Sequence, residues 1–155
     1  MELSRIQKFG LGLGISAISL IFIVVQLSNF SRDTSLNNWA QGFEGYVKTS
    51  RLQADTGKPM AVFFYTDWCT SCKQLREEIL SSPEVSEYMA NVHPVKVNPE
   101  SDVLENRLAQ EFGVIGYPSF FIVDAGTDKI KPIRRTANIT PEQFVAQLEA
   151  AAATL

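Results

Sequence analysis

Residues 65–73, YTDWCTSCK, contain both cysteines of this 155-residue chain, Cys69 and Cys72. The stretch follows MAVFFY, residues 60–65, a short apolar run rich in aromatic residues that predicts a strand buried on both faces. It leads into KQLREEIL, residues 73–80, which consists of residues that favour a helix. The two cysteines are therefore predicted where a buried strand passes into the first turn of a helix.

Three kinds of site use cysteines at this spacing. A closed zinc site needs four ligands, but the chain adds only one histidine, His93, and a carboxylate such as Asp67. A purely structural disulfide would close a gap of two residues, which restricts the unfolded chain very little. We favour the third kind, a redox pair, and keep the other two as alternatives.

The redox interpretation has a physical basis in the helix start. Free N–H groups and the helix dipole favour the thiolate form of Cys69 there, and the thiolate is the attacking species. Cys72 lies one turn further along the same predicted helix face, within reach of a mixed disulfide at Cys69. Cys69 is therefore the expected nucleophile and Cys72 the expected resolving cysteine.

A membrane anchor is predicted near the N-terminus. Residues 9–27 are uncharged and, at about 1.5 Å per residue, span roughly the hydrocarbon thickness of a bilayer. Arg5 and Lys8 precede them, which keeps residues 1–8 in the cytoplasm and exports the rest across the inner membrane to the periplasmic side. A cleaved signal peptide is the alternative, although the run exceeds the usual signal core and lacks an A-x-A-like site.

The net charge of the chain limits the classes of binding partner that we expect. After Arg32 the chain carries 16 acidic and 11 basic residues, which gives the exported domain a net charge of −5. The sequence shows no basic patch, so nucleic acid is not an expected partner. Disulfides persist in exported proteins, which agrees with a redox pair there.

The remaining patterns predict one domain. Residues 28–38 are polar and read as a linker, and residues 39–155 follow as the domain. Its predicted elements are a helix over residues 39–56, strands at residues 92–97, 119–124 and 129–135, and helices from Ser82, over residues 101–112 and from Thr140. Pro132 weakens the last strand. The order predicts an α/β fold, with a mixed sheet of four to five strands and helices on both faces. Parallel strands come first and an antiparallel hairpin last.

Two segments carry a family resemblance. YTDWCTSCK resembles the active-site segment of thioredoxin-like proteins, Trp-Cys-x-x-Cys-Lys after a buried strand. FGVIGYPSFFIVD, residues 112–124, is similar to the family's Val-x-Gly-x-Pro-Thr segment, whose proline is cis and faces the cysteines. The match extends from about Trp39 to the C-terminus. DWCxxCK, the helix start at Ser82-Pro83 and GYPS most resemble the C-terminal thioredoxin-like domain of bacterial membrane thiol:disulfide interchange reductases.

The resemblance implies roles by position. Pro118 matches the cis-proline that shapes the substrate groove, and Tyr117 before it would contact the substrate chain or form the groove wall. Trp68 would shield the disulfide or simply pack, and Lys73 would favour the thiolate or remain a solvated lysine. The sequence departs from the thioredoxin pattern at Phe63, where a buried Asp is usual. Asp67 is then the nearest carboxylate, either a substitute acting through water or a solvated loop acid.

The predicted function combines these features. Thr70 and Ser71 between the cysteines carry no charge, which argues against a strong oxidant. We expect a membrane-anchored thiol-disulfide oxidoreductase that reduces or exchanges disulfides of exported proteins, with no cofactor or metal beyond the Cys69–Cys72 disulfide. Residues 9–27 hold no cysteine, so a separate membrane electron donor is implied. A non-catalytic peptide- or protein-binding module, or a disulfide isomerase or oxidase, is the alternative.

Overall fold

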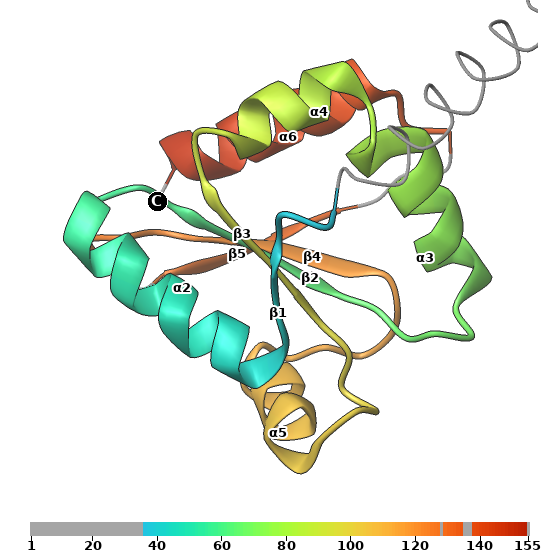
Figure 1. The fold of residues 1–155 in the computed structure, drawn as a ribbon. Coiled ribbons are helices and arrows are strands. Elements are labelled where there is room, and N and C mark those ends of the chain that lie inside the picture. The colour runs from blue at the N-terminus through green and yellow to red at the C-terminus, as the bar shows by residue number, and fades with distance from the viewer. Residues whose placement is uncertain (1–35, 128, 135–137, 155) are drawn as a thin grey trace, which may run out of the picture. The chain divides into compact units, whose positions relative to one another are not determined.

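Figure 1 shows the computed structural model of the chain, which describes residues 36–127, 129–134 and 138–154. The predicted residues 1–8, the anchor 9–27 and linker residues 28–35 lie outside the described part. Among the described helices, none is long and apolar enough to cross a membrane. The folded unit begins at Leu36, which falls in the predicted linker but is buried in the core.

The sheet has five strands in the order β1-β3-β2-β4-β5. They are β1 (Ala40–Gln41), β2 (Met60–Phe64), β3 (His93–Val97), β4 (Ser119–Val123) and β5 (Ile130–Ile133). β1, β3 and β2 are parallel, β4 runs antiparallel to β2, and β5 runs antiparallel to β4. All five residues of the central β2 are buried, as its continuous apolar run predicted.

Helices cover both faces of this sheet (Figure 1). They are α2 (Gly42–Thr56), α3 (Thr70–Gln74) with its π-helical continuation η1 (Leu75–Leu80), α4 (Pro83–Met89), α5 (Val103–Glu111) and α6 (Pro141–Ala153). Ser82 and Thr140 cap α4 and α6, each followed by proline, and Thr140 forms a reciprocal capping box with Gln143. These helix starts are where the sequence predicted them.

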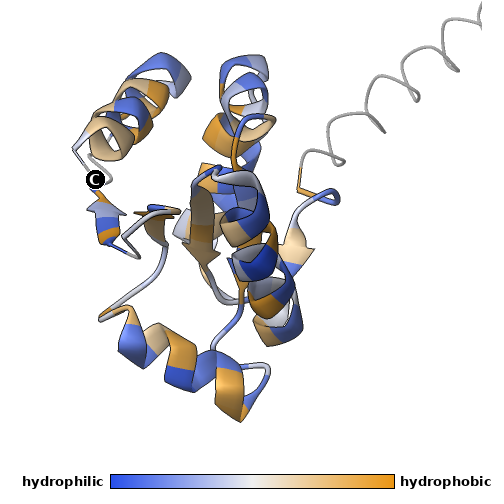
Figure 2. Ribbon diagram, turned by 90° about the vertical axis from the view of Figure 1, so that its left-hand side faces the viewer, coloured by the Kyte–Doolittle hydropathy of each residue, from blue (hydrophilic) through white to orange (hydrophobic). Residues whose placement is uncertain are grey.

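Alternating residues of the strands build two cores. Phe63 points to the face covered by η1, α4 and α6, where Leu75 and Phe144 pack. Phe64 points to the face covered by α2 and α5, where Phe112 packs. Figure 2 shows the central strands coloured mainly hydrophobic and the surrounding helices coloured in both colours. The predicted mixed sheet with helices on both faces is thus confirmed.

Two details of the prediction were wrong. The first helix begins at Gly42, which has a φ of +70°, and not at Trp39. Trp39 is buried and meets Phe63 and Phe120 edge-on, because residues 40–41 first pair with β3 as a strand. A strand of two residues is too short to show a period in the sequence.

The second error concerns β4, which the alternating order predicted to be parallel. Val97 at the end of β3 and Ser119 at the start of β4 both lie opposite Phe64. The connection through α5 therefore starts and finishes at the same end of the sheet, so β4 must run back along β2. Pro132, which weakened the prediction of the last strand, lies on the edge strand β5, where a proline is tolerated.

Candidate active site

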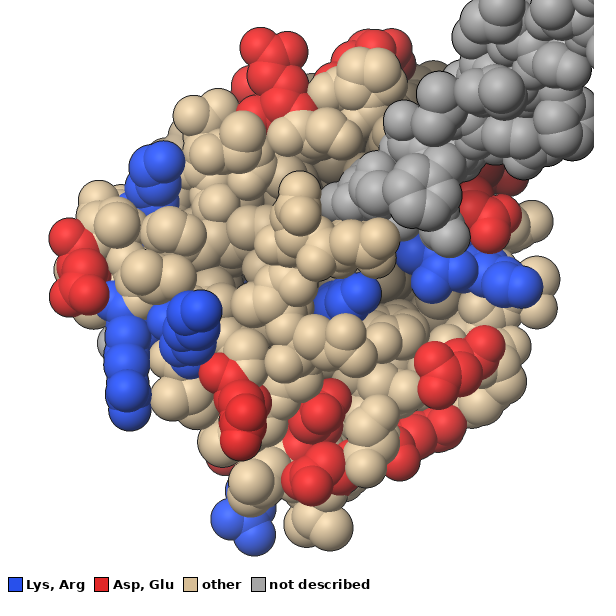
Figure 3. Space-filling model, in the orientation of Figure 1, with Lys and Arg blue, Asp and Glu red and all other residues tan. Residues whose placement is uncertain are grey.

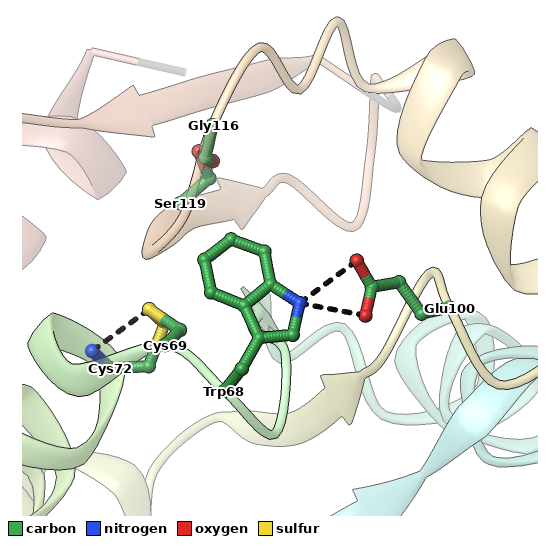
Figure 4. The surroundings of a disulfide bond; sticks show 6 residues. All are labelled: Trp68, Cys69, Cys72, Glu100, Gly116 and Ser119. Carbon is green, nitrogen blue, oxygen red and sulfur yellow. Dashed lines mark hydrogen bonds between the residues drawn. A yellow bond between two sulfur atoms is a disulfide. The ribbon is translucent and has the colours of Figure 1, made fainter.

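Cys69 and Cys72 form a disulfide with an S–S distance of 2.05 Å and a Cα–Cα distance of 5.2 Å. Cys69 is the N-cap of α3, and its sulfur accepts a hydrogen bond from the Cys72 backbone N–H at 3.1 Å (Figure 4). Both residues are buried, with 6% and 4% of their surfaces exposed. The first cysteine is therefore located at the helix start, as the sequence predicted.

The turn between β2 and α3 positions the pair. Tyr65 extends β2 by donating its N–H to the carbonyl of Val97 at 3.0 Å. The Cys69 N–H then bonds the Thr66 carbonyl at 3.2 Å, and the Lys73 N–H bonds the Cys69 carbonyl at 3.1 Å. The backbone thus reverses and enters the helix within four residues, with the cysteines at its first turn.

The zinc alternative is contradicted by the position of His93. It pairs with Met60 at the start of β2, whereas the cysteines follow the end of β2, so the histidine lies at the opposite end of the sheet. Its ring Nε2 lies 2.7 Å from Thr56 Oγ1. Among the described residues, no group of three His, Cys, Asp or Glu side chains is arranged to hold a metal ion.

Trp68 lies beside the disulfide and is held by a residue that the sequence did not single out. Its side chain is 69% exposed, so it is not a core residue. The indole N–H donates to both carboxylate oxygens of Glu100, at 3.0 and 2.9 Å (Figure 4). Its ring meets Tyr117 edge-on, with ring centroids 6.4 Å apart. Glu100 follows β3 in a turn in which its N–H bonds Asn98 Oδ1 at 3.1 Å.

The Tyr117-Pro118 peptide is cis, as the resemblance implied. Ser119 Oγ donates to the Gly116 carbonyl at 2.8 Å across this bond. Figure 4 shows Gly116 and Ser119 above the disulfide and beside the Trp68 indole. Burial, and secondarily the charge of Glu100, raise the pKa of Tyr117 above its ordinary value. The Trp68 loop and the cis-proline loop thus meet at one site.

A small cavity of about 50 Å³ lies beside the disulfide. Both cysteines line it, together with Phe63, Thr66 and three charged side chains, namely Asp67, Lys73 and Arg76. Phe63 occupies the position where thioredoxins usually carry a buried Asp. Its ring stacks on Tyr65 and Phe120, with ring centroids 5.6 and 6.1 Å apart.

Asp67 is held at the cavity mouth. Its Oδ2 accepts from the buried Asn98 side chain at 3.2 Å, and the Asn98 N–H in turn donates to Glu105 at 2.9 Å. Asp67 and Lys73 are both exposed and line the same cavity as the cysteines. That Asp67 accepts a proton through water and that Lys73 favours the thiolate stay predictions. Figure 3 shows acidic and basic side chains interspersed on the displayed face of the domain.

Comparison with known families decides the assignment. A family model described as a thioredoxin-like domain matches residues 48–152, most of the described chain. The chain belongs to the thioredoxin-like family. It carries the Cys69–Cys72 disulfide and is homologous to thiol-disulfide oxidoreductases, in agreement with the predicted class of enzyme.

Relatives of this thioredoxin-like protein include the thiol:disulfide interchange protein DsbD. The Haemophilus ducreyi protein is 28% identical over 99 residues, which cover 63% of this chain and 17% of that protein. The Yersinia pestis (strain Pestoides F) protein is 28% identical over 112 residues, 69% of this chain and 19% of that protein. The chain thus spans less than a fifth of the length of these curated relatives.

Solved structures show the same fold. The C-terminal domain of Neisseria meningitidis DsbD in its reduced form has a TM-score of 0.61 at 22% identity, covering 72% of this chain and 98% of that one. DsbH oxidoreductase has a TM-score of 0.62 at 22% identity, covering 76% and 85%. The resemblance to the C-terminal domain of interchange reductases is therefore confirmed.

Proposed function

We propose that this protein is anchored in the inner membrane and reduces or exchanges disulfides of exported proteins on the periplasmic side. The observation that carries the proposal is the Cys69–Cys72 disulfide at the start of α3, beside the loop of the cis-Pro118 peptide. The anchor rests on the uncharged residues 9–27 behind Arg5 and Lys8.

The chemistry follows from the helix start. In the reduced protein the Cys69 thiolate attacks a substrate disulfide and forms a mixed disulfide with one of its sulfurs. Cys72, one turn further along α3, attacks the Cys69 sulfur and releases the substrate as a thiol. Two electrons pass to the substrate, and the disulfide seen here is the product state. Its re-reduction needs a separate membrane electron donor, because residues 9–27 contain no cysteine.

The substrate chain is expected to lie along the cis-proline loop. Trp68 and Ile115 are exposed, and Tyr117 is half-buried beside them. Exposed apolar side chains beside a reactive disulfide suit an extended or unfolded segment of a protein substrate. Examples are the disulfide-containing components of cytochrome c maturation.

The direction of electron flow depends on charges near the sulfurs. Lys73 and Arg76 favour a thiolate electrostatically, Asp67 opposes it, and the intervening Thr70 and Ser71 are uncharged. This mixture supports a reductant or a modest exchanger rather than a strong oxidant. Isomerase or oxidase activity is the alternative direction for the same site.

Mixed-disulfide trapping tests the proposal. The full chain is expressed with its N-terminal segment as the Cys72→Ser variant, which should accumulate mixed disulfides with exported proteins, whereas Cys69→Ser should trap none. Wild-type protein reduced in detergent should also reduce insulin. A non-catalytic binding module would trap nothing with either variant, and that result would refute the proposal.

The reduction potential of the Cys69–Cys72 pair decides whether the protein reduces or oxidises its substrates. Equilibration with glutathione should give a value nearer to that of thioredoxin, about −270 mV, than to that of DsbA, about −120 mV. A value at the DsbA end would identify an oxidase instead.

A further inference from the structure

Thr66 carries a buried hydroxyl that the fold leaves unpaired. Thr66 lies two residues after the end of β2 and is 2% exposed, and its Oγ1 has no hydrogen-bond partner among the described residues. Nearly all buried polar atoms in native proteins are paired with protein or with ordered water. Thr66 lines the cavity of about 50 Å³ that both cysteines also line.

The cavity suits a water molecule. About 10–15 Å³ is enough for one water, provided that it finds two or more polar partners. Thr66, Cys72 and Asp67, which carry a hydroxyl, a sulfur and a carboxylate, are among the residues that line this space. Its lining includes the buried Thr66 and Cys72 as well as the exposed Asp67 and Lys73, so the same cavity borders the disulfide and residues that reach solvent.

We propose that Thr66 holds a water in this cavity, and that this water takes the proton of Cys72 when the mixed disulfide is resolved. The inference rests on the proposed function and adds a positioning residue to it. Phe63 offers no base at the end of β2, so the proton of the buried Cys72 has to leave by another route. A water anchored at the Thr66 hydroxyl supplies that route.

The charged groups around the cavity agree with this role. Asp67 is the one carboxylate among the described residues that line it, and it can pass the proton to solvent. Lys73 and Arg76 favour the Cys72 thiolate that remains. Tyr65 stays protonated, because burial and then Asp67 raise its pKa.

Two further groups lie on neighbouring elements. Lys96 on β3 pairs opposite Phe63 and interacts electrostatically with Arg76, which adds positive charge on that side. Glu105 on α5 accepts the Asn98 N–H and lies within electrostatic range of Tyr65. Asp67 remains the carboxylate at the cavity itself.

The step balances. The Cys72 thiol gives its proton to the water and becomes a thiolate. Its electron pair forms the bond to the Cys69 sulfur, and the bond between Cys69 and the substrate sulfur breaks. The substrate leaves as a thiolate and takes a proton from solvent, while the water passes its extra proton to Asp67 or bulk water. The cysteine pair is oxidised and the substrate reduced by two electrons.

Reaction with 5,5′-dithiobis(2-nitrobenzoate) separates this step from the first attack. The reduced full chain releases one thionitrobenzoate when Cys69 attacks and a second when Cys72 resolves. Thr66→Val removes the hydroxyl at nearly constant shape, and Thr66→Ser keeps it. We expect Thr66→Val to slow the second release about tenfold below neutral pH, with the first release within about twofold of wild type. The difference should disappear at alkaline pH, and Thr66→Ser should match wild type.

The outcomes are distinct. Equal second-release rates for Thr66→Val and wild type across the pH range would overturn the inference while leaving the proposed function intact. A wild-type protein that releases no second thionitrobenzoate would instead overturn the proposed function. If Thr66→Val fails to fold, a high-resolution crystal structure of the wild type decides. An ordered water bonded to Thr66 Oγ1 supports the inference, and a dry cavity refutes it.

Discussion

The indole N–H of Trp68 is bound by both carboxylate oxygens of Glu100, at 3.0 and 2.9 Å. This contact joins the loop after β2 to the turn after β3. It fixes a largely exposed aromatic ring beside the disulfide and against Tyr117. The aromatic surface beside the disulfide is therefore braced by the Glu100 carboxylate.

Glu100→Gln should weaken substrate binding more than chemistry. A neutral amide accepts the indole N–H less strongly than a carboxylate, so the Trp68 ring becomes less ordered. We expect KM for insulin to rise about threefold, with kcat almost unchanged, since a surface bond of this kind contributes about 1 kcal/mol or less. The matched control is Glu111→Gln, an exposed glutamate at the end of α5. Equal KM values for the two variants would contradict this role.

Phe63→Asp should not restore thioredoxin-like proton handling but should destabilise the fold. Phe63 is 2% exposed and packs against Trp39, Tyr65 and Phe120. We expect a loss of more than about 3 kcal/mol in the free energy of unfolding, against about 1 kcal/mol for the control Phe63→Leu.

The pH dependence of Phe63→Asp follows from the same burial. Burial raises the pKa of the new carboxyl in the folded protein, so the unfolded state releases the proton first as the pH rises. The variant should therefore lose further stability between about pH 4 and pH 7. Urea titrations at both pH values, each with a wild-type reference, measure this. A variant that is more stable at the higher pH would show that the site accepts a charge.

Lys96→Met should stabilise the protein at neutral pH. Burial, and secondarily the positive charge of Arg76, lower the pKa of Lys96. The unfolded state then binds more protons in the window between this lowered pKa and the ordinary value of about 10.4, so wild-type stability rises with pH there. The advantage of the variant should shrink over that window. Thermal unfolding at pH 7 and at about pH 10 tests this, with the exposed Lys48→Met as control.

Gln53→Leu should loosen α2 from the sheet. Gln53 is buried on α2, and its side-chain amide donates to the Val123 carbonyl on β4 at 2.8 Å. Removing the donor while burying an apolar side chain should cost about 1–2 kcal/mol in urea unfolding. Gln110→Leu, on the exposed side of α5, should change stability by less than about 0.5 kcal/mol. A cost no larger than that of Gln110→Leu would show that the bond contributes little.

Much of the fold and site was predictable because its signals are local. The buried run of β2, the cysteine spacing and the proline after Tyr117 each occupy a few adjacent residues. The caps at Ser82 and Thr140 are equally local, since they consist of one polar side chain before a proline.

The features that escaped prediction depend on contacts between distant segments. Glu100 lies 32 positions from Trp68 in the chain, and no pattern in the sequence around Glu100 predicts this contact. The direction of β4 depends on where the α5 connection returns to the sheet. The unpaired hydroxyl of Thr66 becomes visible only when its surroundings are assembled.

Val97 on β3 and Ser119 on β4 both pair with Phe64 at the end of β2, and this pairing affects how the site can move. The site is built from three loops, which follow β2, follow β3 and precede β4. These loops are connected to the three innermost strands of the sheet. We expect fraying of the edge strands β1 and β5 to leave these loops undisturbed. Backbone amides beneath the site should therefore exchange with solvent only when the whole domain opens. The geometry around the cysteines is thereby protected from the small, frequent openings at the rim of the sheet.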